Sequence, residues 1–142
     1  MFATFDKREF PLIHIKLSGT INSDEEFEAF TREWISCDEM RKPYTFMFDS
    51  IDVGFVNIRY AVKTARFIQT LKAQINSVYL EKSIIVCSRT YIHYLLSFIF
   101  YLQKPVAPVY IVSSNEKAAE LYIQLQNGLD LYGSDVSFIP TE

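Results

Sequence analysis

Two carboxylates, Asp49 and Asp52, are the residues of this chain best placed to do chemistry. They follow residues 44–48, which are apolar on both alternating sides, as is typical of a strand covered on both faces. In open α/β sheets, ligands bind beyond the carboxyl ends of strands, where two carboxylates could hold Mg²⁺ or serve as acid and base. The same pair could instead shape a turn by accepting backbone N–H bonds. No third carboxylate or phosphate-binding lysine stands in register with them, so we favour the turn.

Other arrangements that support catalysis are missing from the sequence. It has no Gly-x-Gly-x-x-Gly or Gly-x-x-x-x-Gly-Lys-Ser/Thr loop for a nucleotide and no Gly-x-Ser-x-Gly elbow for a serine nucleophile. Neither His14 nor His93 has a partner at metal-ligand spacing. Cys37 and Cys87 lie in apolar periodic segments, where a thiol behaves as a small buried hydrophobe. We therefore expect a protein that is not an enzyme and needs no cofactor or metal, with an Asp-dependent enzyme as a third alternative.

Length and composition are those of a globular protein. The chain has 142 residues, 49% apolar and 22% charged, with a net charge of −3, so we expect a single domain over residues 1–142, with its core at about 10–125 and a tail at 128–142. This charge is too small to favour nucleic acid as a partner. The start lacks the pattern of a secretory signal, and no apolar stretch approaches the ~20 residues of a membrane span. We expect a cytoplasmic protein with no transmembrane segment.

Hydrophobic periodicity predicts strands that alternate with helices. Alternating or continuous apolar runs predict strands at residues 2–9, 11–17, 44–48, 83–87 and 109–112. Apolar positions three and four apart predict helices at residues 23–37, 58–75, 91–102 and 114–125, the first of them opened by a capping box of Ser23 and Glu26. The order ββαβαβαβα predicts an α/β fold with a mainly parallel sheet of four to five strands and an antiparallel N-terminal edge strand.

Charge is distributed unevenly between the first two predicted helices. The first is rich in Asp and Glu, whereas residues 53–80 contain no acidic residue. Arg59, Lys63 and Arg66 follow one another at spacings of four and three, which places them on one stripe of the second helix. Two solvated helix faces explain this pattern, and so does a docking surface whose charges select a protein partner.

Three segments of the chain carry a family resemblance. They are residues 12–21 before the acidic helix, residues 44–49 before the basic helix, and residues 108–118, which lead into the last helix. With the element order, they resemble the STAS domain of bacterial anti-sigma factor antagonists and its SpoIIAA-like relatives, over about residues 10–125. That fold is grouped structurally with the lipid-binding CRAL-TRIO domain. The resemblance implies a non-enzymatic protein-interaction or scaffold module. We expect it to work in an oligomer or a larger assembly.

In the STAS domains that are switched by phosphorylation, the modified serine lies in an Asp-Ser-Ser/Thr-Gly segment before the second helix. The corresponding segment here, residues 55–59, contains no hydroxyl residue, so we expect a module without the usual phosphorylatable serine. The resemblance still implies that this loop and the following helix start contact a partner. The candidate partner-binding residues are Asp52, Gly54, Asn57, Arg59, Lys63 and Arg66.

The predicted helix at residues 91–102 is apolar nearly all round, as is typical of a helix covered on several sides. It could border a pocket for a lipid or another apolar small molecule, which the relationship to CRAL-TRIO domains implies. It could equally pack against a second copy of the chain, because large exposed apolar patches are rare on monomers. Tyr94, Phe98 and Tyr101 are the candidates for an apolar-ligand site or an oligomer surface.

Overall fold

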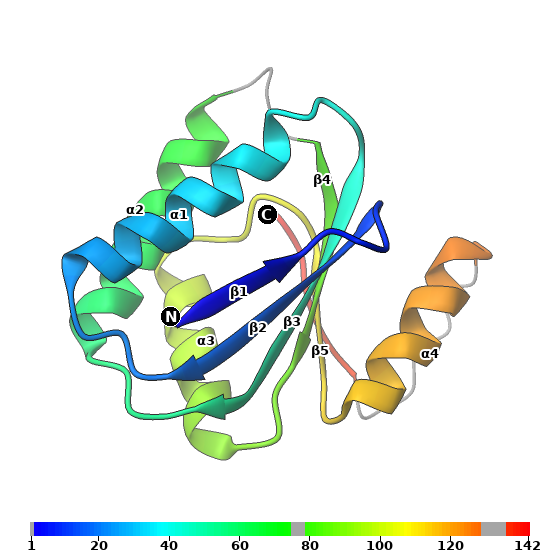
Figure 1. Ribbon diagram of the computed structural model, residues 1–142. Coiled ribbons are helices and arrows are strands. Elements are labelled where there is room, and N and C mark those ends of the chain that lie inside the picture. The colour runs from blue at the N-terminus through cyan, green and yellow to red at the C-terminus, as the bar shows by residue number, and fades with distance from the viewer. Residues whose placement is uncertain (1, 75–78, 129–135) are drawn as a thin grey trace.

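The fold is a mixed β-sheet with helices on both faces (Figure 1). A computed structural model describes residues 2–74, 79–128 and 136–142 of the chain. Its elements are β1 (Ala3–Asp6), β2 (Leu12–Gly19), α1 (Asp24–Asp38), β3 (Tyr44–Val53), α2 (Ile58–Ala73), β4 (Leu80–Val86), α3 (Thr90–Leu102), β5 (Val109–Val112), α4 (Asn115–Gln126) and β6 (Ser137–Ile139). The predicted order of strands and helices is confirmed as far as α4.

The sheet has six strands, so the prediction of four to five was wrong. The additional strand, β6, pairs antiparallel with β5 through Val109 opposite Ile139 and Ile111 opposite Ser137. It is only three residues long, and so short a run cannot be distinguished from a loop by its alternation. Residues 129–135 of the predicted tail lie outside the described residues.

β3 is longer than the apolar run that predicted it. It continues to Val53, and beyond a register shift Asp52 lies opposite Ser18 and Val53 opposite Gly19 of β2. Asp49 and Asp52 therefore lie within the strand, not in a turn after it. The strand continues because β2 also runs on to Gly19 and supplies hydrogen-bonding partners to the polar end of β3.

The strands lie in the sheet in the same order as in the chain. β2 to β5 are parallel, and the edge strands β1 and β6 are antiparallel to their neighbours, which confirms the predicted antiparallel N-terminal edge. Each crossover steps to the next strand in the same direction, and such crossovers are right-handed, so α1, α2 and α3 lie on one face of the sheet. α4 lies on the opposite face (Figure 1).

The central strands bury side chains on both faces of the sheet. On the face covered by α1, α2 and α3, Ile13 and Phe46 are fully buried, and the ring of Trp34 packs 5.1 Å from that of Phe46. On the other face, Ile84 is fully buried and belongs to a cluster that includes Leu121 of α4. This two-sided burial explains why residues 44–48 are apolar on both alternating sides.

Side-chain caps begin the two helices that carry the charged pattern. Ser23 Oγ accepts a hydrogen bond from the Glu26 N–H at 3.2 Å, as the capping box predicts. Asn57 Oδ1 accepts one from the Arg59 N–H at 2.9 Å. Each cap satisfies an N–H group that has no partner inside its helix. The caps thereby determine where the first turns of α1 and α2 stand.

Candidate functional site

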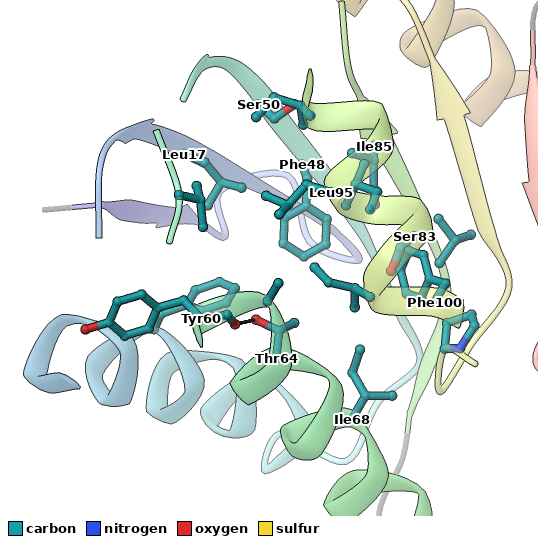
Figure 2. A pocket seen from close by; sticks show the side chains of 18 of the residues that line it. Leu17, Phe48, Ser50, Tyr60, Thr64, Ile68, Ser83, Ile85, Leu95 and Phe100 are labelled. Carbon is teal, nitrogen blue, oxygen red and sulfur yellow. Dashed lines mark hydrogen bonds between the residues drawn. The ribbon is translucent and has the colours of Figure 1, made fainter. Parts of the chain in front are cut away.

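An apolar cavity of about 150 Å³ lies between the sheet and helices α2 and α3 (Figure 2). Much of its lining is shared by three parts of the fold: Leu17, Phe48, Ser50, Ser83 and Ile85 come from the sheet, Tyr60, Ala61, Thr64 and Ile68 from α2, and Ile92, Leu95, Leu96, Ile99 and Phe100 from α3. None of the lining residues in the described part of the chain is charged. The cavity is therefore a space suited to an apolar group.

Small side chains open this space. Ser50 and Ser83 face the helices from positions two residues away from Phe48 and Ile85 in their strands, so a serine stands where the neighbouring sites have large apolar groups. Across from the sheet, Ala61 of α2 also lines the cavity. Protein interiors are normally packed with few voids larger than a water molecule. Unfilled space of this size beside the aromatic core is therefore a specific feature of this fold.

Most hydroxyl groups around the cavity are already hydrogen-bonded within the protein. Ser50 Oγ donates to the Val86 carbonyl oxygen at 2.6 Å, and Thr64 Oγ1 donates to the Tyr60 carbonyl oxygen at 2.7 Å. The Tyr60 hydroxyl donates to Asp24 Oδ1 at 3.3 Å. These three hydroxyl groups therefore already donate their hydrogen bonds within the protein.

The hydroxyl of Ser83 differs from the other three. Ser83 is 3% exposed, lines the cavity, and makes no side-chain hydrogen bond to any other described residue. Sequence reasoning did not find Ser83, because a serine at the start of an apolar run gives no sign of the space it faces. Only the fold shows that Ser83 faces a cavity, because the fold places helix α3 opposite strand β4.

A tyrosine of α3 fastens the segment that precedes α2. The Tyr91 hydroxyl donates to the Val56 carbonyl oxygen at 2.9 Å and accepts from the Val56 N–H at 2.9 Å. Val56 is buried and lines the cavity. This pair of hydrogen bonds between the Tyr91 side chain and the Val56 backbone therefore holds a part of the cavity wall against the first turn of α3.

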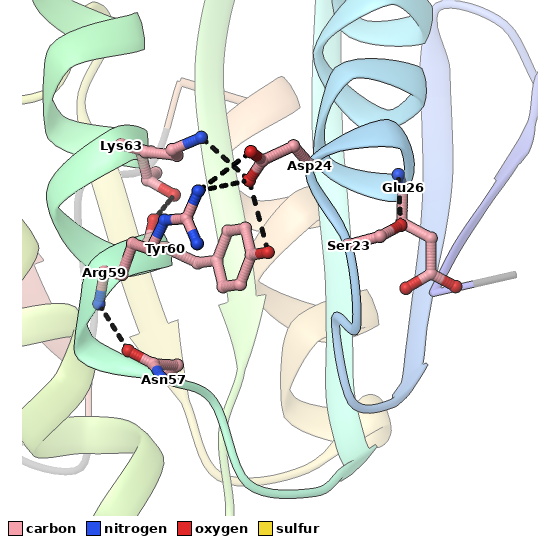
Figure 3. Close-up of polar contacts among 8 residues, drawn as sticks. Ser23, Asp24, Glu26, Asn57, Arg59, Tyr60 and Lys63 are labelled. Carbon is pink, nitrogen blue, oxygen red and sulfur yellow. Dashed lines mark hydrogen bonds and ion pairs between the residues drawn. The ribbon is translucent and has the colours of Figure 1, made fainter.

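The predicted basic stripe of α2 is bonded to the acidic start of α1 (Figure 3). Arg59 Nη2 lies 2.8 Å from Asp24 Oδ2, and Lys63 Nζ lies 2.9 Å from Asp24 Oδ1. Both cations also lie near the Tyr60 ring, with 5.6 Å from Arg59 Cζ and 5.8 Å from Lys63 Nζ to the ring centroid. The hydrogen bond from Lys63, together with the charge of Arg59, lowers the pKa of Asp24 from its ordinary value.

This arrangement changes the interpretation of the charge pattern. Arg59 and Lys63 both donate hydrogen bonds to Asp24, so they join α2 to α1 within the domain. Asn57 caps α2, and Arg66 is exposed farther along the same helix. That Asn57, Arg59, Lys63 and Arg66 contact a partner stays a prediction.

The other two predicted partner-binding residues lie at the end of β3. Asp52 Oδ2 accepts from Lys16 Nζ at 3.0 Å. The Gly54 N–H donates to the Gly19 carbonyl oxygen at 2.7 Å, and a Cβ at Gly54 would stand 3.1 Å from Thr20 Oγ1. Gly54 thus has a local packing role, and neither residue belongs to the group around Asp24.

Asp49 and Asp52, the two carboxylates that could support catalysis, share one lysine. Lys16 Nζ lies 3.0 Å from Asp52 Oδ2 and 3.8 Å from Asp49 Oδ2, and the hydrogen bond to Asp52 raises the pKa of Lys16. Asp49 Oδ1 accepts from the Ile51 N–H at 3.0 Å, which confirms that it bonds nearby backbone. The described residues contain no group of three or more His, Cys, Asp or Glu side chains that could hold a metal.

The thiols are buried, as their sequence positions predict. Cys37 and Cys87 are free and buried. Burial raises the pKa of Cys37 to about 11 and also raises that of Cys87, so both thiols are protonated at neutral pH. They act as small apolar side chains rather than as nucleophiles.

None of the three aromatic candidates of α3, Tyr94, Phe98 and Tyr101, lines the cavity. Tyr94 is 71% exposed and Tyr101 is 84% exposed, while Phe98 is half-buried against the core. The cavity is instead lined by the inner face of α3, including Leu95, Leu96 and other large apolar residues. The helix therefore has an inner face toward the cavity and an outer aromatic face toward solvent.

Within the described ranges, no helix combines the length and the apolar character that crossing a membrane requires. Comparison with protein-family models, with curated proteins and with solved structures finds no match for this chain.

Proposed function

We propose that this domain binds a small apolar molecule in the cavity between the sheet and helices α2 and α3. The observation that carries the proposal is the cavity itself, about 150 Å³ with an uncharged lining. Apolar space left unfilled costs folding stability, because the side chains that line it lose packing contacts. A bound apolar ligand would restore the missing contacts, and cavities lined by apolar residues are known to take up such molecules.

Filling the cavity with protein should abolish binding. We expect Ala61→Leu to weaken the binding of benzene at least tenfold, because the larger side chain enters the space, and to leave the melting temperature unchanged or raised. An ordinary close-packed site would instead lose about 1 to 3 kcal/mol on such an enlargement. Affinity is measured by chemical-shift titration and stability by thermal unfolding.

The matched control is Ala119→Leu, the same change at an exposed position of α4 on the opposite face of the sheet. It should leave benzene affinity at the value of the unmodified protein. A destabilised Ala61→Leu variant that still binds benzene normally would contradict the proposal.

A second candidate function is a STAS-like interaction or scaffold module without the usual phosphorylatable serine. The outer face of α3 favours it, because Tyr94 and Tyr101 expose aromatic surface on a helix whose sequence contains no Lys, Arg, Asp or Glu. Large exposed apolar patches usually mark an interaction site. The partner would be another protein or a second copy of the chain, and the free thiols Cys37 and Cys87 support a cytoplasmic setting.

Native mass spectrometry tests this second candidate. If α3 mediates self-association, the protein should have a multiple of the chain mass, and the double variant Tyr94→Glu with Tyr101→Glu should have the mass of one chain. Ile123→Glu, at an exposed apolar position of α4, is the control and should keep the multiple. A single-chain mass for the unmodified protein, with no partner retained from cell extract, would contradict the proposal.

A further inference from the structure

We infer that the ligand of this cavity is a compact, uncharged molecule of about six to ten non-hydrogen atoms, with one oxygen or nitrogen that bonds to Ser83. The inference rests on the proposed function, because it names the chemical class that the same cavity would take. It excludes a long acyl chain with an ionised carboxylate as the molecule that the cavity holds.

The size of the ligand follows from the volume of the cavity. A space of about 150 Å³ matches the engineered apolar cavity that binds benzene. An acyl chain of about sixteen carbons has roughly three times as many non-hydrogen atoms as benzene and needs more room than this volume offers. The rings of Phe48, Tyr60 and Phe100 in the lining also favour a ring, which can meet them edge to face.

The charge of the ligand follows from the lining. No Lys, Arg or His is found among the lining residues that the structure describes, so nothing there would compensate an ionised group. Moving an unpaired carboxylate from water into such a space is strongly unfavourable. The cavity therefore selects a neutral molecule.

The polar atom of the ligand follows from Ser83. Of the hydroxyls that line the cavity, those of Ser50, Tyr60 and Thr64 already donate to protein atoms, whereas the Ser83 hydroxyl has no hydrogen-bonding partner among the described residues. Figure 2 shows Ser83 among the side chains that line the cavity. A hydroxyl that faces an apolar cavity without a protein partner is unfavourable, and a ligand oxygen or nitrogen near it would supply the missing bond. Ser83 would then orient the polar end of a ring-shaped ligand.

The test compares phenol, benzene and hexadecanoate as probes at neutral pH. In Ser83→Ala we expect the ratio of phenol affinity to benzene affinity to fall about three- to tenfold, because only phenol can bond the hydroxyl. Benzene affinity itself should stay unchanged, and hexadecanoate should bind more weakly than phenol. Ser88→Ala is the same substitution at an exposed position just after β4 and should leave the ratio unchanged.

The outcomes separate the inference from the proposed function. An unchanged ratio in Ser83→Ala, or tighter binding of hexadecanoate than of phenol, would overturn the inference while leaving an apolar ligand in the cavity. Failure of all three probes to bind would overturn the proposed function together with the inference. Thermal unfolding of Ser83→Ala, which is expected to match that of the unmodified protein within a few degrees, shows that the variant is folded.

Discussion

Replacing Phe46 with alanine is expected to lower the free energy of unfolding by about 3 to 5 kcal/mol. Phe46 is fully buried at the centre of the sheet, and its ring centroid lies 5.1 Å from those of Trp34 and Tyr44 and 5.4 Å from that of Phe48. Alanine would remove these contacts and leave a second void next to the existing cavity. Equilibrium unfolding in urea measures the loss.

The control for this variant is Phe55→Ala, the same change at a position that is 68% exposed. Its effect should stay within about 0.5 kcal/mol, as is usual for surface substitutions. Similar losses for the two variants would mean that the aromatic cluster around Trp34 does not form the stabilising centre of the fold.

Replacing Tyr44 with phenylalanine is expected to cost about 1.5 to 3 kcal/mol, because it removes a hydrogen bond to a charged group. The Tyr44 ring is fully buried, and its hydroxyl donates to Asp38 Oδ1 at 2.6 Å. The same carboxylate oxygen accepts from the Tyr79 N–H at 3.0 Å, so it joins the end of α1 to the segments that begin β3 and β4. Urea unfolding at neutral pH measures the difference.

The pH dependence gives this variant a second signature. Burial and the Asp38 carboxylate raise the pKa of Tyr44 well above its usual range. The contribution of Tyr44 is therefore complete below the unfolded pKa of about 10 and is lost as the pH rises above it, because only the unfolded chain then releases the proton. The unmodified protein should lose stability above pH ~10 more steeply than Tyr44→Phe. Tyr101→Phe, at an exposed position, should behave like the unmodified protein; equal slopes for all three would contradict this account.

Local signals in the sequence predicted the elements that depend on local physics. The Ser23 cap, the helical spacing of Phe27, Trp34 and Cys37, and the apolar strand at 44–48 all specify structure within a few neighbouring residues. Strand β6 and the polar end of β3 escaped prediction, because both owe their extended conformation to hydrogen bonds from another strand. Such pairing is a property of the assembled sheet and leaves little trace in a short segment.

The candidate site was harder to predict from the sequence, because it too depends on contacts between segments that are far apart in the chain. Arg59 and Lys63 were recognised as a stripe, but their partner Asp24 lies 35 and 39 residues away in the chain. The bond from Lys16 to Asp52 depends on the pairing of β2 with β3. The cavity depends on small residues such as Ser83 and Ala61 lining the same space from different elements, although neither residue is unusual within its own segment.

The most direct test of the ligand cavity is a titration of the isotope-labelled protein with phenol, followed in ¹H–¹⁵N correlation spectra. We expect saturable shifts at residues whose side chains line the cavity, such as Ile68, Ser83 and Leu95, and none at Leu121 of α4 on the opposite face of the sheet. Shifts confined to α4 or to the outer face of α3, or no saturable shift at all, would contradict the account.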